Sequence, residues 1–217
     1  LKGDRVLGML LTTSHALKEW AVAVNALEQG KTIVLLRKGG IRESGGRFQV
    51  DRDEVLLYPT YEHQQPELLK PEYAKQVTPV TSGWHPDTIR IGSWAKITDI
   101  VPVVDETIVK ALLPFHIWNE TFIRDRLKWK PSQPVYVLLL RAYKLSQVHQ
   151  ISYRAEYGGC RSWIDLNEAI DLEAATPVLD DATYKQKVSE IRNAIDYLPR
   201  PKPVPRETFD HSNNSPV

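Results

Sequence analysis

The sequence predicts an α+β fold with a mainly antiparallel mixed sheet packed with three to four helices. Two observations lead to this prediction. Apolar residues recur at helical spacing in a few segments, and they alternate or run continuously in several shorter ones. These segments follow one another as helix, strands, helices, strands and helix, without the regular strand–helix alternation of a doubly wound nucleotide-binding fold. The composition, with 42% hydrophobic and 25% charged residues, is that of a folded globular protein.

The first part of the chain is expected to form one helix and three strands. Residues 14–30, SHALKEWAVAVNALEQG, place apolar side chains at helical spacing and end at a glycine. The apolar face comprises Leu17, Trp20, Ala21, Val24 and Leu27. Glu19 falls on the opposite face, so we expect it to be solvated. The expected strands lie at 32–37, 48–50 and 54–58. The polar, Pro-containing stretch from Gln64 to Pro86 is expected to be a long ordered loop or lid.

The rest of the chain is expected to contain five strands and three helices. Residues 88–104 are interrupted at Gly92 and Ser93, which predicts two strands. Residues 135–145, VYVLLLRAYKL, have the strongest strand pattern, and 148–154 are expected to pair with them. The remaining expected elements are a strand at 160–166 and helices at 106–113, 114–129 and 181–198.

Together these elements predict a single α+β domain at residues 10–198, with a subdomain boundary near residue 105 as an open alternative. Residues 199–217 are Pro-rich and polar, and we expect an extended or disordered tail. The chain has one cysteine, Cys160, which excludes an internal disulfide framework and fits a reducing, cytoplasmic compartment. There is no apolar run of about eighteen residues, so no membrane-spanning helix is expected. The net charge of +1 implies no global attraction to nucleic acid or membrane.

The segment RKGGIRESGG contributes the first candidate ligand-binding residues: Arg37, Lys38, Gly39 and Gly40. Basic side chains beside glycines can offer charge and accessible backbone N–H groups to an anion. The segment is not a P-loop, because it lacks the G-x-x-x-x-G-K-[ST] pattern and no helix start follows. A hairpin with two tight turns is the structural alternative.

The segment YPTYEHQ places four hydrogen-bonding side chains directly after an expected core strand: Tyr61, Glu62, His63 and Gln64. In an extended backbone Tyr61 and His63 would share one face, and Glu62 would point to the other. A general-base or metal-ligand role for His63 would then require an orienting partner from elsewhere in the chain. Ordinary structural hydrogen bonding is the alternative for each of these residues.

Arg141 and His149 complete the candidate set. Arg141 follows a buried apolar run, and a buried guanidinium requires either a carboxylate partner or a phosphate-like ligand. His149 is expected near it across the predicted hairpin. Cys160 is expected to be an inert core residue, with nucleophilic catalysis as the alternative.

A basic segment and the tryptophans offer further sites of contact. Residues 124–130, RDRLKWK, would make a helix end locally basic and could join Arg37, Lys38 and Arg42 in a phosphate-binding surface. A solvated helix end is the alternative. The six tryptophans of the chain are expected to anchor the core or an interface, with stacking on bases or sugars as the alternative.

The phrases ALKEWAV, LLRKGGIRE, LLYPTYEHQ and LLKPEY resemble a bacterial family, domain of unknown function 1802. The resemblance runs from about Ala16 to Tyr73 and continues more loosely through LLLRAYKL and YGGCRSWIDL. It implies one self-contained bacterial unit and assigns no reaction, cofactor or catalytic residue.

Three hypotheses about function follow from the residues. The first is a binding module that accepts an anionic ligand, a nucleotide or the phosphates of nucleic acid, in a polar cleft. The second is a metal-dependent phosphodiester hydrolase with Glu43, Glu62 and His63 as metal ligands or acid–base groups. No recognised metal-binding spacing such as H-E-x-x-H supports it. The third is an assembly or interaction module without catalysis, in which exposed tryptophans anchor the interface.

Overall fold

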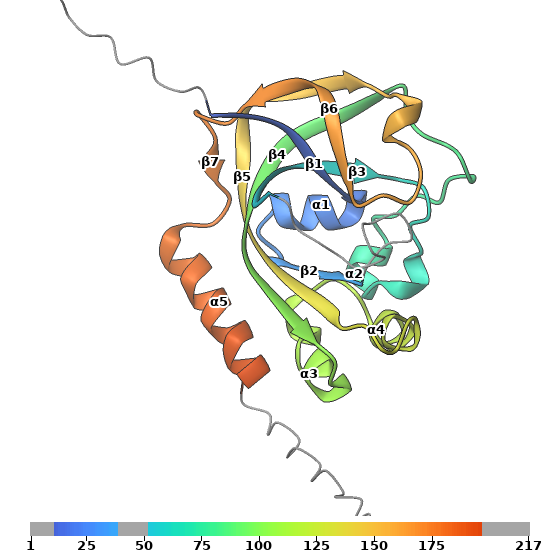
Figure 1. Ribbon diagram of the computed structural model, residues 1–217, viewed down its shortest axis with the longest axis vertical. Coiled ribbons are helices and arrows are strands. Elements are labelled where there is room, and N and C mark those ends of the chain that lie inside the picture. Colours follow the sequence, from blue (N-terminus) through green and yellow to red (C-terminus); the bar gives the residue numbers. More distant parts are fainter. Residues whose placement is uncertain (1–10, 39–51, 197–217) are drawn as a thin grey trace, which may run out of the picture.

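The computed structural model describes residues 11–38 and 52–196. Seven strands form one sheet, in which β2, β5, β4, β3, β1 and β6 are neighbours in that order and β7 pairs with β5 (Figure 1). The strands are β1 (Thr12–Trp20), β2 (Val34–Arg37), β3 (Glu54–Thr60), β4 (Thr88–Val103), β5 (Val135–Ser152), β6 (Trp163–Asp171) and β7 (Thr176–Pro177). The α-helices are α1 (Ala21–Glu28), α2 (Pro71–Ala74), α3 (Glu106–Ala111), α4 (Glu120–Lys128) and α5 (Asp181–Asp196). Short 3₁₀ turns occur at Pro66–Leu68, Leu113–Phe115 and Ala155–Tyr157.

The predicted fold class is confirmed. β1 and β3 run parallel, and the other paired strands run antiparallel, so the sheet is mixed and mainly antiparallel. The helix beyond the expected three to four is α2, a single turn within the segment predicted to be a long loop. The predicted strand at 48–50 and the predicted tail at 199–217 lie outside the described residues.

The predicted helix at residues 14–30 is wrong in its first half. Residues up to Trp20 form β1, and only Ala21–Glu28 form the helix α1. Ala16 and Leu17 point to opposite faces of the sheet, and both are fully buried. A strand buried on both faces does not alternate, so its apolar residues can mimic helical periodicity. Pairing of Ala16–Trp20 with β3 therefore outweighs the local helix propensity.

The strands β4 and β5 are longer than predicted. Gly92 does not end a strand: the register of β4 against β5 shifts between Ile91 and Ser93, and the strand continues. Such an irregularity bends a strand without ending its pairing. Residues 148–154 also do not fold back on 135–145. Most of them extend β5, where Ile151 pairs with Ile89 of β4.

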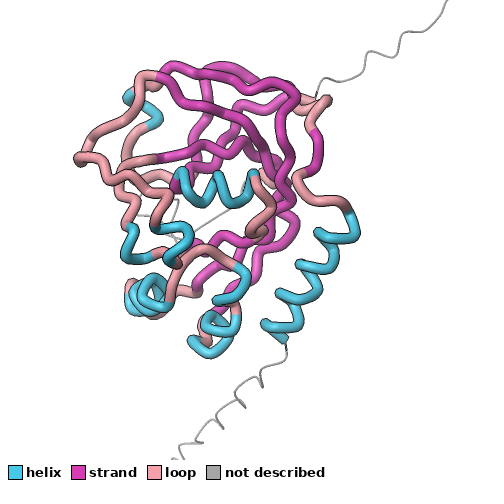
Figure 2. The backbone as a smooth tube through the Cα atoms, turned by 180° about the vertical axis from the view of Figure 1, so that it is seen from behind, coloured by secondary structure: helices cyan, strands magenta, loops and turns pink. Residues whose placement is uncertain are grey.

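The curved sheet has apolar residues packed on both of its faces. The larger cluster joins buried residues of α1, α3, α4 and α5 to β2, β3 and β5. The smaller cluster contains Leu56, Tyr58, Ile91 and Ile164 and lies on the opposite side of β1 and β3. Figure 2 shows α1 within the curve of the strands, seen from behind.

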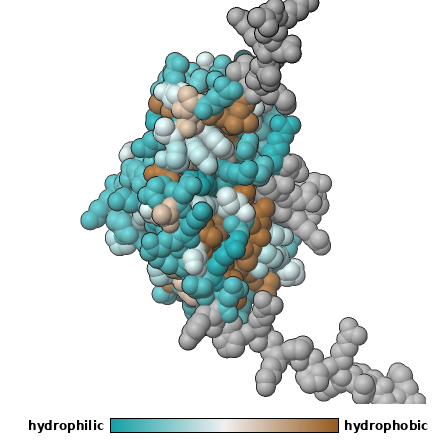
Figure 3. Space-filling model, turned by 90° about the vertical axis from the view of Figure 1, so that its left-hand side faces the viewer, coloured by the Kyte–Doolittle hydropathy of each residue, from teal (hydrophilic) through white to brown (hydrophobic). Residues whose placement is uncertain are grey.

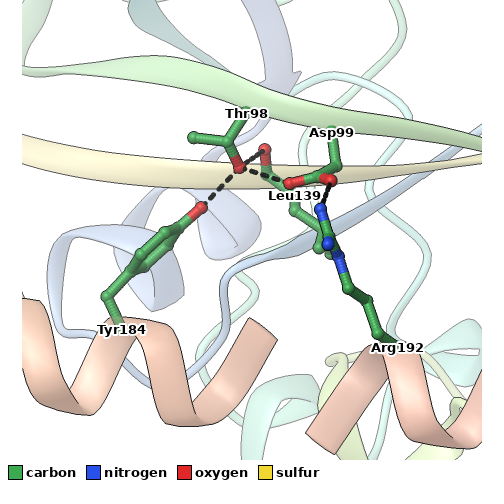
Figure 4. Close-up of polar contacts among 5 residues, drawn as sticks. All are labelled: Thr98, Asp99, Leu139, Tyr184 and Arg192. Atoms are coloured by element: carbon green, nitrogen blue, oxygen red, sulfur yellow. Dashed lines mark hydrogen bonds and ion pairs between the residues drawn. The ribbon is translucent and has the colours of Figure 1, made fainter. Parts of the chain in front are cut away.

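The last helix, α5, is docked on the sheet by polar contacts (Figure 4). The hydroxyl of Tyr184 lies 2.7 Å from that of Thr98, which also donates to the carbonyl of Leu139. Farther along α5, Arg192 forms an ion pair with Asp99 of β4. On the side of the molecule shown in Figure 3, hydrophobic side chains reach the surface as small patches among hydrophilic ones. The predicted apolar face of α5 packs against the larger apolar cluster through the buried side chains of Tyr184 and Ile191.

Candidate functional site

A cavity of about 560 Å³ lies where β1, β2 and β3 end. Its walls also include the segments 84–86 and 157–162 and one side of α4. This volume is within the range of about 300–1,000 Å³ that is typical of small-molecule sites. The described cationic side chains that line it are Lys18, Arg37, Lys38, Arg126 and Arg161, and the carboxylates are Glu19 and Glu62. The cavity wall therefore carries more positive than negative side chains.

The pairing of β1 with β3 determines which side chains meet in the cavity. Lys18 lies beside Tyr58, and Glu19 lies beside Pro59. Because neighbouring residues on a strand point to opposite faces, Lys18 and Glu19 lie on opposite sides of the sheet at its end. The cavity is lined by both, so it extends around this end of the sheet.

Glu19 is the buried carboxylate of the site, and its side chain is only 7% exposed. One of its oxygens, Oε2, lies 3.3 Å from Nη2 of Arg37, which also donates to the carbonyl of Lys18. The expectation that Glu19 is solvated is wrong. That expectation assumed that Glu19 lies on a helix. In the structure Glu19 lies on β1, which directs its side chain inward toward Arg37 of β2.

Arg126 of α4 is a second guanidinium near the same carboxylate. Its Cζ atom lies 4.8 Å from the centre of the Phe122 ring. Desolvation and the nearby charge of Arg37 lower the pKa of Arg126, while Glu19 opposes this change. An arginine remains charged nonetheless. Among the described residues, no carboxylate or carbonyl accepts a hydrogen bond from its guanidinium.

The two lysines of the cavity are held by backbone carbonyls. Nζ of Lys38 donates to the carbonyls of Arg126 and Leu127 across 2.6 and 3.1 Å, in the last turn of α4. Nζ of Lys18 donates to those of Tyr157 and Gly159 across 2.6 and 2.9 Å. Burial is the main cause that lowers the pKa of both ammonium groups. A lysine at a helix C-terminus stabilises the helix, so Lys38 has a structural role there.

Glu62 and His63 do not follow the alternation that an extended backbone would impose. β3 ends at Thr60, and His63 has a positive φ of 64°. The resulting turn brings Nε2 of His63 to 3.1 Å from Oε1 of Glu62. The same carboxylate accepts hydrogen bonds from the backbone N–H of Gly83 and the hydroxyl of Ser82. The N–H of Gly83 is the main cause of a lowered pKa for Glu62.

The remaining residues of the YPTYEHQ segment have different surroundings. Tyr61 lines the cavity, where its ring meets that of Trp84 edge-on with centres 6.0 Å apart. Gln64 does not line it. Its side-chain oxygen accepts the N–H of Val22 across 3.0 Å, which satisfies a free donor in the first turn of α1.

The structure thus brings five of the ten predicted site residues to one cavity: Arg37, Lys38, Tyr61, Glu62 and His63. Arg141 lies elsewhere, paired with Asp181 and near the rings of Tyr143 and Tyr184. His149 is on β5 opposite Ile91 and does not line the cavity. Gly39 and Gly40 lie outside the described residues, as do Arg42 and Glu43.

Several residues of the cavity were not candidates from the sequence. Lys18 and Glu19 were hidden by the predicted helix, and Tyr58 had the appearance of an ordinary core residue. The basic segment 124–130 gave a usable signal, although only Arg126 and Trp129 of its residues line the cavity. Cys160 also lines the cavity and is exposed, so the expectation of a core cysteine is wrong.

Aromatic rings make up much of the wall. Those of the described residues are Trp20, Tyr58, Tyr61, Trp84, Trp118, Phe122, Trp129, Tyr153 and Tyr157. His85 stacks on Tyr153, and Trp118 stacks on Phe122. Desolvation raises the pKa of Tyr58, so its hydroxyl is neutral at physiological pH. The site therefore combines uncharged aromatic surface with a cluster of cations.

Residues 11–38 and 52–196 contain no group of three or more His, Cys, Asp or Glu side chains placed to hold a metal ion. None of the helices in these ranges combines the length and the apolar character required to cross a bilayer.

Comparison with known proteins identifies the family. The family model described as Domain of unknown function (DUF1802) matches residues 16–190, and the chain belongs to this family, as the resemblance predicted. Among solved structures, the crystal structure of ASCH from Zymomonas mobilis matches with a TM-score of 0.43 and 16% sequence identity. The match covers 81% of this chain and 92% of that chain. No curated protein matches the sequence.

Proposed function

We propose that this member of the DUF1802 family binds an anionic, phosphate-bearing ligand in the cavity at the ends of β1, β2 and β3. One observation carries the proposal: the cavity is lined by Arg37, which pairs with the buried carboxylate of Glu19, and by Arg126, for which the described residues provide no ion pair or hydrogen-bond acceptor. A desolvated guanidinium without an anion or hydrogen-bond acceptor is costly. A phosphate that accepts hydrogen bonds from Arg126 would remove this cost, because the planar fork of donors matches phosphate oxygens.

A nucleotide or a nucleic-acid phosphate is the ligand class that we favour. The wall offers both cations and many aromatic rings, and a nucleotide offers both a phosphate and a flat base. In this proposal Arg126 and Arg37 neutralise the phosphate, while Tyr61 and His63 contact the rest of the ligand. Lys38 supports α4, which carries Arg126.

The proposal includes a cytoplasmic location in a bacterium. Its support is the presence of one cysteine in the whole chain, Cys160, whose thiol is exposed. A reducing compartment keeps such a thiol free.

The test compares two arginines of the same helix. Arg126→Met removes the guanidinium that lines the cavity, and Arg124→Met removes an exposed one that does not. Binding of pyrophosphate and of adenosine 5′-monophosphate is measured by calorimetry at low ionic strength. We expect Arg126→Met to weaken binding about tenfold or more, because a charge-assisted hydrogen bond is lost. We expect Arg124→Met to change the affinity by less than about twofold.

Equal effects of the two replacements would show that the anion is attracted by general positive charge and not by this cavity. Thermal unfolding of both variants is the control for folding. Arg126 has no hydrogen-bond acceptor among the described residues, so its replacement should leave the Tm close to that of the wild type.

A further inference from the structure

We propose that Trp84 is the stacking platform for the aromatic base of a nucleoside phosphate bound in the cavity. This inference rests on the proposed function, which supplies the phosphate end of the ligand. It adds the class of the ligand: a purine or pyrimidine base joined to a phosphate, either as a free nucleotide or as a unit of a single strand.

Trp84 is an unusual residue of the cavity wall because much of its large ring is exposed. Its exposed fraction is 44%, and Trp129 is the other tryptophan among the described residues with comparable exposure. Both line the cavity. An indole stacks favourably on a nucleic-acid base, whichever base it is. Exposed tryptophans in a concave site are therefore suited to contact a flat ligand.

The ring of Trp84 is held in place by its surroundings. Tyr61 contacts it edge-on, with the two ring planes at 89°. The backbone N–H of Trp84 closes a turn on the carbonyl of Thr81, and Gly83 adopts a positive φ of 81° within this turn. Glu62 binds the turn through the N–H of Gly83 and the hydroxyl of Ser82. A platform that is positioned before binding loses little conformational entropy when the ligand arrives.

Other rings of the wall already have a partner on their faces. Lys130 places its ammonium 4.8 Å from the ring centre of Trp129. His85 and Tyr153 stack on each other, as do Trp118 and Phe122. Among the described residues, the indole of Trp84 has one contact with another ring, the edge-on contact with Tyr61, and no cation lies over it. Its indole is accordingly the one we assign to the base.

The experiment separates the base from the phosphate. Affinities of adenosine 5′-monophosphate and ribose 5-phosphate, which lacks the base, are measured by calorimetry for the wild type and for Trp84→Leu, Trp84→Phe and Trp129→Leu. For the wild type we expect the nucleotide to bind about tenfold more tightly than ribose 5-phosphate. Trp84→Leu should remove this advantage and leave the affinity for ribose 5-phosphate unchanged.

Two variants serve as controls. Trp84→Phe retains an aromatic face and should bind the nucleotide within about threefold of the wild type. Trp129→Leu removes an exposed indole from the same wall and should leave the advantage of the nucleotide intact. Cys160 reports where the ligand binds, because it is the only cysteine of the chain and lines the cavity. Bound nucleotide should slow its alkylation by iodoacetamide.

Each result decides between the two proposals. If the wild type binds both probes equally, or if Trp84→Leu weakens both equally, the assignment of Trp84 is overturned while phosphate binding stands. If adenosine 5′-monophosphate binds without slowing the alkylation of Cys160, it binds elsewhere and the assignment is also overturned. If neither probe nor a short single-stranded oligoadenylate binds, both proposals fail.

The oligoadenylate also identifies the source of the nucleoside phosphate. Tighter binding of the oligonucleotide than of the mononucleotide, with a steeper dependence on salt, supports a unit of a single strand. Equal affinity supports a free nucleotide.

Discussion

The carboxylate of Glu62 accepts a hydrogen bond from the backbone N–H of Gly83 across 2.6 Å. This contact joins the segment that follows β3 to the turn that carries Trp84, although Glu62 and Gly83 are 21 residues apart in the chain. Glu62 was a candidate acid–base or metal-binding group from the sequence. Its observed partners also position the wall of the cavity.

Replacement of Glu62 by Gln should destabilise the protein in a pH-dependent manner. The glutamine retains an acceptor for Gly83 but loses the charge, so we expect a loss of about 1 kcal/mol or less at neutral pH. The folded pKa of Glu62 lies below its ordinary value of 4.5, so the charge stabilises the fold above pH 4.5. This stabilisation disappears as the pH falls through the lower folded pKa. Urea denaturation of both proteins over this range measures the difference.

A difference between wild type and Glu62→Gln that stays constant into the acid range would contradict this assignment. Glu168→Gln is a suitable control, because Glu168 is an exposed residue of β6. It should change the free energy of unfolding by less than about 0.5 kcal/mol at every pH.

Replacement of Arg37 by Met should destabilise the fold strongly. It leaves the carboxylate of Glu19 buried without its ion-pair partner, which we expect to cost about 3 kcal/mol. The double variant Glu19→Gln/Arg37→Met should recover part of this loss, because it no longer buries an unpaired charge. Chemical denaturation of the two single variants and the double variant forms the thermodynamic cycle. Additive effects would mean that the two residues do not interact.

Replacement of Lys38 by Met distinguishes a structural lysine from a ligand-binding one. The ammonium donates to two carbonyls in the last turn of α4, so its loss should lower the free energy of unfolding by about 1–2 kcal/mol. At a temperature where the variant remains folded, its affinity for pyrophosphate should fall by less than about threefold. A large loss of affinity without a loss of stability would return Lys38 to the ligand-binding role predicted from the sequence.

Replacement of His116 by Leu should make the protein less sensitive to acid. Burial, followed by the nearby charge of Lys70, lowers the pKa of His116 to about 3. Its ring nitrogens make no hydrogen bond of good geometry with the described residues, although backbone groups of Trp118 and of His116 itself lie close. Loss of the imidazole should therefore cost little at neutral pH.

The sign of the acid effect follows from the protons bound in each state. Below the ordinary histidine pKa of 6.5 the unfolded chain binds a proton at His116, whereas the folded protein does not until the pH nears 3. The stability of the wild type should thus fall over this range by up to about 4 kcal/mol from this residue. Denaturation at several pH values should give a flatter profile for His116→Leu. Parallel profiles would show that the pKa of His116 is the same in the folded and unfolded states.

Part of the cavity wall was visible in the sequence because its residues are close along the chain. Arg37 ends a short buried strand and Lys38 follows it, and Tyr61 and His63 follow another strand, so the local pattern was sufficient to select them. Arg141 was selected by the same reasoning, but Asp181 of α5 satisfies its charge. The type of residue and its position after a strand do not reveal which partner the fold will supply.

Lys18 and Glu19 show where the local pattern fails. Their segment has helical periodicity, and only its parallel pairing with β3 turns it into a strand and sends the two side chains to opposite faces. Trp84 lies in a segment without periodicity, and its position depends on Glu62 and Tyr61. No argument from neighbours in the sequence could have placed it.

The amino-acid order alone was enough to establish the α+β class, most of the elements and the family, because these depend on patterns within short segments. The cavity, its excess of cations and the open indole of Trp84 depend on contacts between residues that are far apart in the chain. Such contacts are decided by which strands pair and where they end. A polar side chain acquires a chemical role only when tertiary structure determines its burial and its neighbours.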